Sequence, residues 1–87
     1  MKELIEAIYA IDKPLLVYIT RETYELIHEP GNNRLAFNDS QHVIHDKEDA
    51  IAALFDADIF GWSIKNFTWC DTASPWMELD VTLFKTN

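Results

Sequence analysis

The chain has 87 residues, of which 48% are hydrophobic and 13% aromatic, enough for one compact domain over residues 1–87. Fifteen acids against seven bases give a formal net charge of −8, which repels phosphate backbones and argues against direct binding to nucleic acid. No apolar run approaches the ~20 residues of a membrane span, and the single Cys70 cannot form an internal disulfide, so we expect a cytoplasmic protein without membrane contact.

The N-terminal part of the chain predicts a helix followed by a strand. Residues 2–11 repeat leucine and isoleucine at helical spacing on one face, with acids in the first turns. Pro14 ends this helix, because proline disfavours a helical conformation in the residue before it. Residues 15–19 are apolar throughout and predict a strand covered on both faces.

Residues 20–29 allow two interpretations. Thr20 is a good cap for a short helix, which is the interpretation we favour. Tyr24 and Leu26 instead alternate with polar residues, as they would in a strand. Residues 30–33, with the sequence Pro-Gly-Asn-Asn, predict a turn.

The middle of the chain predicts two short strands and the clearest helix. Residues 34–38 and 42–45 are the strands, joined around residues 39–41. Asp46 is a helix cap, and charged residues fill the first turn of a helix predicted over residues 47–57. The side of this helix expected to face the core comprises Ala50, Ile51, Leu54 and Phe55.

A hairpin is predicted at the C-terminal end, from residues 61–70 and 76–84 with a turn at residues 71–75. The apolar phase changes midway along its first strand, which a bulge near Lys65-Asn66 reconciles. The apolar side of its second strand comprises Met77, Leu79, Val81 and Leu83.

The order of elements predicts an α+β fold. We expect a single small domain with a mostly antiparallel sheet of four to five strands. Two helices pack on one face of that sheet, or three if residues 20–29 are helical.

Sequence patterns that would indicate catalysis or metal binding are weak. His42, His45 and Asp46 lie close together, but two histidines three apart in a strand point to opposite faces, and no zinc or calcium motif is present. Cys70 beside Trp69 is typical of a small core residue rather than a nucleophile. Two glycines are too few for a glycine-rich phosphate-binding loop. From these weak patterns together we expect neither a metal nor a cofactor.

One pair of acids has the spacing of a glycosidase dyad. Glu78 and Asp80 share a strand face, about 6–7 Å apart. A chain this small leaves little room for a sugar cleft, and the solvated side of a hairpin also explains the pair. An enzyme is therefore not the favoured interpretation.

Tryptophans beside acids suggest a protein-binding surface instead. If the apolar side of the last strand faces the helices, Trp76 lies on the other side with Glu78 and Asp80, and the phase change leaves either Trp62 or Trp69 there too. Exposed tryptophan rimmed by acids is typical of a binding patch, although an indole that merely covers the end of the sheet is the alternative.

Two further acids lie at the end of the predicted second helix. Asp56 and Asp58 oppose the helix dipole there, unlike the acids of the first turn, which the dipole stabilises. We therefore include them in the expected partner-binding set, which comprises Asp56, Asp58, Trp69, Trp76, Glu78 and Asp80.

These features favour a non-enzymatic binding protein that inhibits a basic-surfaced partner, such as a nucleic-acid-binding enzyme. Phage anti-defence proteins of the anti-CRISPR or anti-restriction type, and immunity proteins, share this general composition. Two alternatives remain open. One is a small oligomeric enzyme or ligand-binding protein that uses histidines and carboxylates, and the other is a structural or assembly subunit that buries its tryptophan face in a homo-oligomer.

Overall fold

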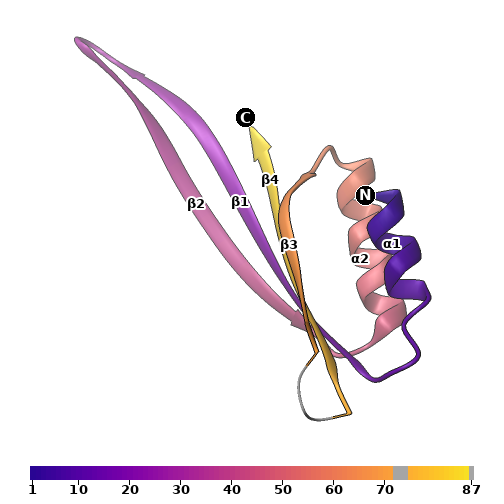
Figure 1. Ribbon diagram of the computed structural model, residues 1–87. Helices are drawn as coiled ribbons and strands as arrows, with labels where there is room; N and C mark the ends of the chain where they lie inside the picture. Colours follow the sequence, from indigo (N-terminus) through magenta and orange to yellow (C-terminus); the bar gives the residue numbers. More distant parts are fainter. Residues whose placement is uncertain (72–74, 87) are drawn as a thin grey trace.

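The computed structural model describes residues 1–71 and 75–86 (Figure 1). It contains two helices and four strands, which confirms the predicted α+β class. The helices are α1 (Lys2–Tyr9) and α2 (Lys47–Ile59). The strands are β1 (Leu15–Glu29), β2 (Asn32–Ile44), β3 (Ser63–Asp71) and β4 (Met77–Thr86).

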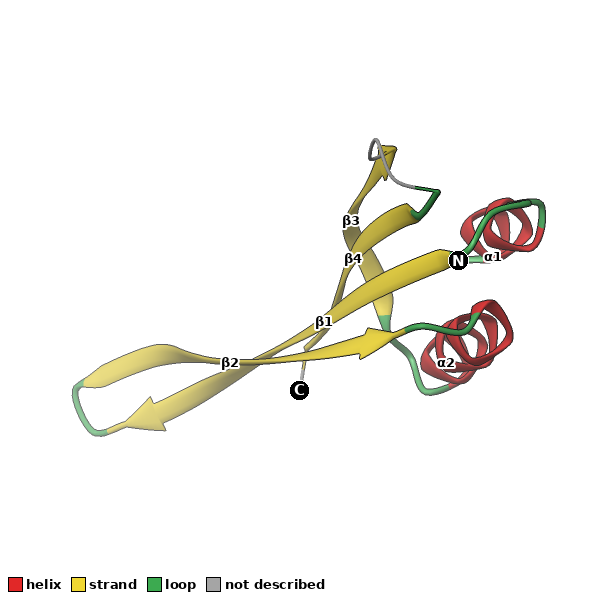
Figure 2. Cartoon of the chain, turned by 90° about the horizontal axis from the view of Figure 1, so that it is seen from below, coloured by secondary structure: helices red, strands yellow, loops and turns green. Residues whose placement is uncertain are grey.

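The four strands form one sheet in the order β2-β1-β4-β3. The central strands β1 and β4 are parallel, and the two outer pairings are antiparallel. Both helices lie on the same side of this sheet, as predicted (Figures 1 and 2). The opposite side, which we call the open face, is covered by no helix or strand of the described chain.

The core lies between the helices and the two central strands. Alternate side chains of β1 and β4 point towards the helices, and each fully buried aliphatic side chain contributes about 1.5–3 kcal/mol of transfer free energy. This arrangement confirms the apolar side predicted for the last strand. The buried residues are Leu4, Ile8, Leu15, Val17, Ile19, Ala50, Leu54, Ala57, Leu79, Val81 and Leu83.

The helix favoured for residues 20–29 is wrong, because this segment is the outer half of β1. It pairs residue by residue with β2 from Val17↔Ile44 to Glu29↔Asn32. Backbone pairing over this length outweighs the local capping preference of Thr20. The two short strands predicted from residue 34 onwards are, for the same reason, one continuous strand.

The long β1–β2 hairpin projects beyond the rest of the molecule (Figure 1). Its turn lies at residues 30–31, where Gly31 has a φ of 79°. The molecule measures 54 × 27 × 16 Å as a result. We call residues 22–39 the hairpin arm.

The apolar side of β1 reverses where the hairpin arm begins. Val17 and Ile19 face the helices, whereas Tyr24 and Leu26 belong to the other alternation and face the open side. No core lies under the arm, and its helix-side residues include polar ones such as Glu25 and Asn38 as well as the partly exposed Ile27. The strand keeps its pairing without a bulge while its buried side changes.

Two details of α2 correct the sequence analysis. The predicted core residue Phe55 is 56% exposed, and Ala57 takes a buried place instead, with Ala50 and Leu54. The helix also continues two residues further, to Ile59. Its predicted cap is confirmed, since the carboxylate of Asp46 accepts a 3.0 Å hydrogen bond from the Glu48 amide.

The predicted bulge in β3 is confirmed by a register shift between Ile64 and Asn66. The extra residue realigns the strand, so that Trp62 and Trp69 both pack against the core on the helix side. The expectation that one of these two tryptophans faces the open side is therefore wrong.

Candidate protein-binding face

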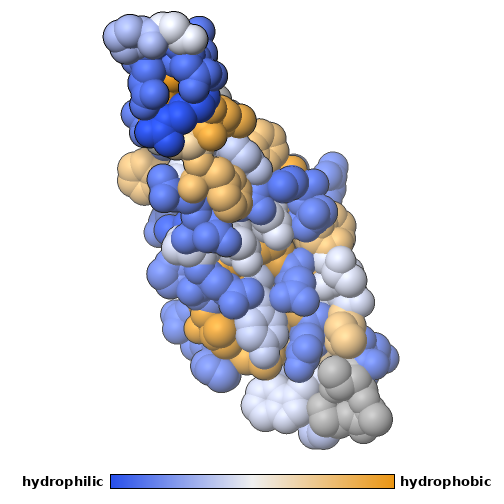
Figure 3. Space-filling view, turned by 90° about the vertical axis from the view of Figure 1, so that its left-hand side faces the viewer, coloured by the Kyte–Doolittle hydropathy of each residue, from blue (hydrophilic) through white to orange (hydrophobic). Residues whose placement is uncertain are grey.

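The open face divides into three regions along the length of the strands. Alternate residues of all four strands contribute to it, and Figure 3 shows apolar side chains there between polar ones. Lys65 is the one lysine or arginine among the described strand residues that contacts groups on this face. The acids on it are Glu22, Asp39, Glu78 and Asp80.

The outer region of the open face is apolar, apart from the polar pair His28 and Asn33 beside the turn. We call it the distal cluster, and it comprises Tyr24, Leu26, Leu35 and Phe37. The rings of Tyr24 and Phe37 lie across from each other with centroids 5.3 Å apart, and the two leucines form the next pair along the ribbon. The side chains of Leu26, Leu35 and Phe37 are 52%, 61% and 50% exposed. Contact with each other therefore buries only about half of each side chain.

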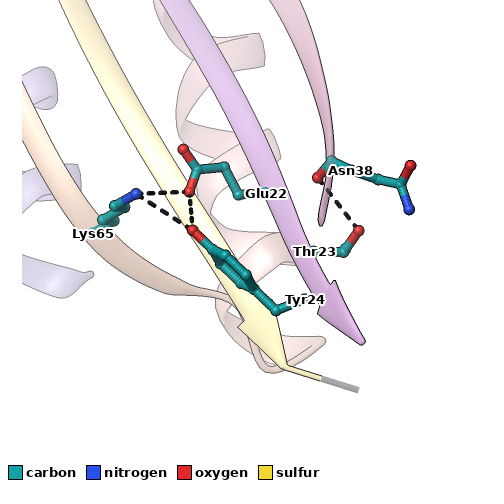
Figure 4. Close-up of polar contacts among 5 residues, drawn as sticks. All are labelled: Glu22, Thr23, Tyr24, Asn38 and Lys65. Carbon is teal, nitrogen blue, oxygen red and sulfur yellow. Dashed lines mark hydrogen bonds and ion pairs between the residues drawn. The ribbon is translucent and has the colours of Figure 1, made fainter. Parts of the chain in front are cut away.

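The middle region holds a hydrogen-bonded ion pair (Figure 4). The Tyr24 hydroxyl donates a 2.6 Å hydrogen bond to Oε2 of Glu22. The Lys65 ammonium donates to the same oxygen at 2.9 Å and to the Tyr24 hydroxyl oxygen at 3.3 Å. These bonds lower the pKa of Glu22, through Tyr24 first and Lys65 second, and the bond to Glu22 raises the pKa of Lys65. Lys65 therefore matches the charge of Glu22, while Asp39, which pairs with Glu22 across β1 and β2, adds a second acid to this region.

The region at the other end of the open face is acidic and aromatic. We call it the proximal patch, and it comprises Leu16, Tyr18, His45, Trp76, Glu78 and Asp80. Parallel pairing places Leu16 beside Glu78 and Tyr18 beside Asp80. Leu16, His45, Trp76 and Glu78 line an open depression of about 300 Å³. Trp76 is 43% exposed beside this depression.

The structure brings together three of the six residues expected to bind a partner. Trp76, Glu78 and Asp80 all belong to the proximal patch. Trp69 is half-buried against the core on the opposite side of the sheet. Asp56 and Asp58 are exposed on α2, so they belong to the helix layer and not to the open face.

The distal cluster is the part of the open face that the sequence analysis missed. Its members lie in segments interpreted as a short helix and a separate short strand. The available signal was the matching alternation of Tyr24 and Leu26 with Leu35 and Phe37 on either side of a tight turn.

Residues considered for catalysis or metal binding do not converge. Within residues 1–71 and 75–86, no group of three histidine, cysteine or acidic side chains could hold a metal ion. His42 pairs with Ile19 on the helix side, whereas His45 lines the depression on the open side. Cys70 is exposed on β3, contrary to the core position predicted for it.

Comparisons with known proteins found no match among family models, curated proteins or solved structures. None of the helices described here is long and apolar enough to cross a bilayer. The chemistry of the open face is therefore the basis for a functional proposal.

Proposed function

We propose that this chain is a non-enzymatic protein that binds and inhibits a basic-surfaced partner protein through the proximal patch. A single observation carries the proposal: Trp76 is exposed beside Glu78 on a face where Lys65, the one described strand lysine that contacts this face, is already bound to Glu22. Large aromatic side chains supply most of the energy at protein interfaces, and unpaired acids beside them select a basic partner.

The mechanism combines electrostatic steering with aromatic anchoring. A net charge of −8 attracts a basic surface over a distance of about 8–10 Å, the screening length in physiological salt. Glu78 and Asp80 then face the partner's lysines and arginines, while the indole of Trp76 enters an apolar pocket. A nucleic-acid-binding enzyme is the class of partner that fits best, because the basic surface that this chain would cover is the surface on which such an enzyme binds its substrate. Phage anti-defence proteins and immunity proteins share this general composition, and the lone Cys70 fits a reducing cytoplasm.

Two double variants with the same change in charge test the proposal. Glu78→Gln/Asp80→Asn neutralises the proximal patch, and Asp56→Asn/Asp58→Asn neutralises the same number of charges on α2. Each tagged protein is used as bait in a cell lysate, and bound proteins are eluted with rising salt. We expect wild type and the α2 variant to retain the same basic protein and the patch variant to lose it.

Kinetics with the captured protein complete the test. We expect the association rate to fall steeply with salt while the dissociation rate changes little. Equal binding by both double variants, or an association rate that is insensitive to salt, would contradict the proposed site.

A further inference from the structure

The outer edge of β2 is an unprotected strand edge. The strand is thirteen residues long, pairs with β1 without a register shift and contains neither proline nor lysine. Proteins normally shield such edges with bulges, lysines or short strands, and the other edge strand, β3, has both a bulge and Lys65. In the described chain, no turn or loop forms a backbone hydrogen bond with β2. Its outward amides and carbonyls are thus available to another strand.

The hairpin arm also lacks cover on its faces. Pairing between β1 and β4 ends at Tyr24↔Thr86, so the arm beyond this point is a ribbon of two strands. Such a ribbon is marginally stable in water. The distal cluster gives this ribbon an exposed apolar side, which a further strand with apolar side chains would extend and cover.

The distribution of charge indicates which kind of strand can pair with the β2 edge. Two of the four acids of the hairpin arm are in ion pairs, since Glu22 is bound to Lys65 at 2.9 Å and Glu29 to Arg34 at 3.1 Å. Strand β2 itself has one base and one acid. A second copy of this acidic chain would meet little repulsion along the balanced β2 edge, and two antiparallel arms hold their acidic bodies at opposite ends.

We propose that two copies of the chain pair through their β2 edges in an antiparallel register, with the two-fold axis at Ala36. A two-fold axis perpendicular to the sheet pairs residues whose side chains lie on the same face. Such an axis therefore passes between one residue and its equivalent in the other copy, and not between two successive residues of a strand. On Ala36 it places Leu35 of each copy opposite Phe37 of the other.

Neighbouring positions of the axis are worse. An axis at Leu35 pairs the two leucines but places each Phe37 opposite Asn33. An axis at Phe37 places Leu35 opposite an acid, and an axis at Asn38 does the same to Phe37. An axis at Asp39 opposes two carboxylates directly, which destabilises a strand pair. The Ala36 register instead merges the two distal clusters into one and creates a continuous sheet of both chains.

The paired segment, residues 32–40 of each copy, is short. Stable interfaces use about 20–30 residues a side, so the dimer forms in a concentration-dependent equilibrium. The proximal patch lies outside the segment, and dimerisation does not depend on the function proposed for that patch.

Sedimentation velocity from micromolar to millimolar protein tests this pairing. We expect the wild-type mass to rise from one chain to two. Leu35→Glu and Phe37→Lys each weaken the dimer about tenfold, because both copies lose an apolar pair. Val43→Lys places a charge on the same strand face outside the paired segment and leaves the dimer intact. Circular dichroism confirms the fold of each variant.

Mixing the variants tests the register. In an equal mixture of L35E and F37K, the introduced glutamate of one chain lies opposite the introduced lysine of the other, so the heterodimer is tighter than either variant alone. A wild-type monomer at millimolar concentration, or equal dimerisation of L35E, F37K and V43K, overturns the pairing. A mixture no tighter than its components overturns the register.

Discussion

The ammonium of Lys65 lies 2.9 Å from Oε2 of Glu22, although β4 separates the strands that carry them. The β3 bulge makes this contact possible, since the extra residue turns Lys65 over the open face. Glu22 stands where the hairpin arm leaves the body of the sheet. The ion pair therefore joins one edge strand to the base of the arm, and Tyr24 shares it through its hydroxyl.

Removing the lysine should loosen this junction. We expect Lys65→Met to lower the midpoint of urea denaturation more than Lys2→Met, which removes the same charge from an exposed position on α1. The reason is that Glu22 loses its cation while Lys2 has no ion pair among the described residues. A double-mutant cycle with Glu22→Gln isolates the coupling between the two side chains. Additive effects of the two substitutions would show that the contact adds nothing to stability.

The same carboxylate predicts a dependence of stability on pH. The Tyr24 hydroxyl, followed by Lys65, lowers the pKa of Glu22 from its ordinary value of 4.5. A carboxyl with a lower pKa in the folded chain stabilises the fold above its ordinary pKa, and this stabilisation is lost as pH falls through the folded pKa. We expect the unfolding free energy of wild type to exceed that of Glu22→Gln by an amount that does not change with pH near neutrality. We expect this difference to shrink below pH 4.5. Urea denaturation at a series of pH values measures it, and a difference of equal size in acid would refute the assignment.

Sequence periodicity predicted the elements that bury one side against the core and failed where no core exists. The β4 alternation and the β3 bulge were predictable because most of their apolar residues pack in or against the core. The outer half of β1 was not, since Thr20 favours a helix locally, whereas pairing with β2, and with β4 as far as Tyr24, fixes the strand. Tertiary contacts decided that segment, and no local pattern contains them.

The candidate site was predictable to the same extent. Alternation along β4 correctly placed Glu78 and Asp80 together on one side. The case for Asp56 and Asp58 rested on the helix dipole alone, which says nothing about the side of the molecule that α2 presents. The distal cluster needed the hairpin register, and this became visible only once β1 and β2 were paired.

Substitutions in α2 test the corrected helix face. Leu54 is fully buried, so Leu54→Ala should lower the unfolding free energy by about 2–5 kcal/mol. Phe55 is 56% exposed, and Phe55→Ala should change the unfolding free energy by less than about 1 kcal/mol. Chemical denaturation of both variants gives the comparison. Equal losses would mean that α2 is rotated relative to the sheet.

Cysteine cross-linking tests the position of the dimer axis. A residue on the axis faces its own copy at about 4.5–5.5 Å between Cα atoms, within disulfide range. In a Cys70→Ser background, which removes the exposed native thiol, Ala36→Cys should form a disulfide-linked dimer rapidly under mild oxidation. Asn38→Cys is the matched control, because it faces position 34 of the second copy and lies about 13 Å from its own equivalent. Non-reducing electrophoresis over time compares the two, and equally fast cross-linking at position 38 would place the axis elsewhere.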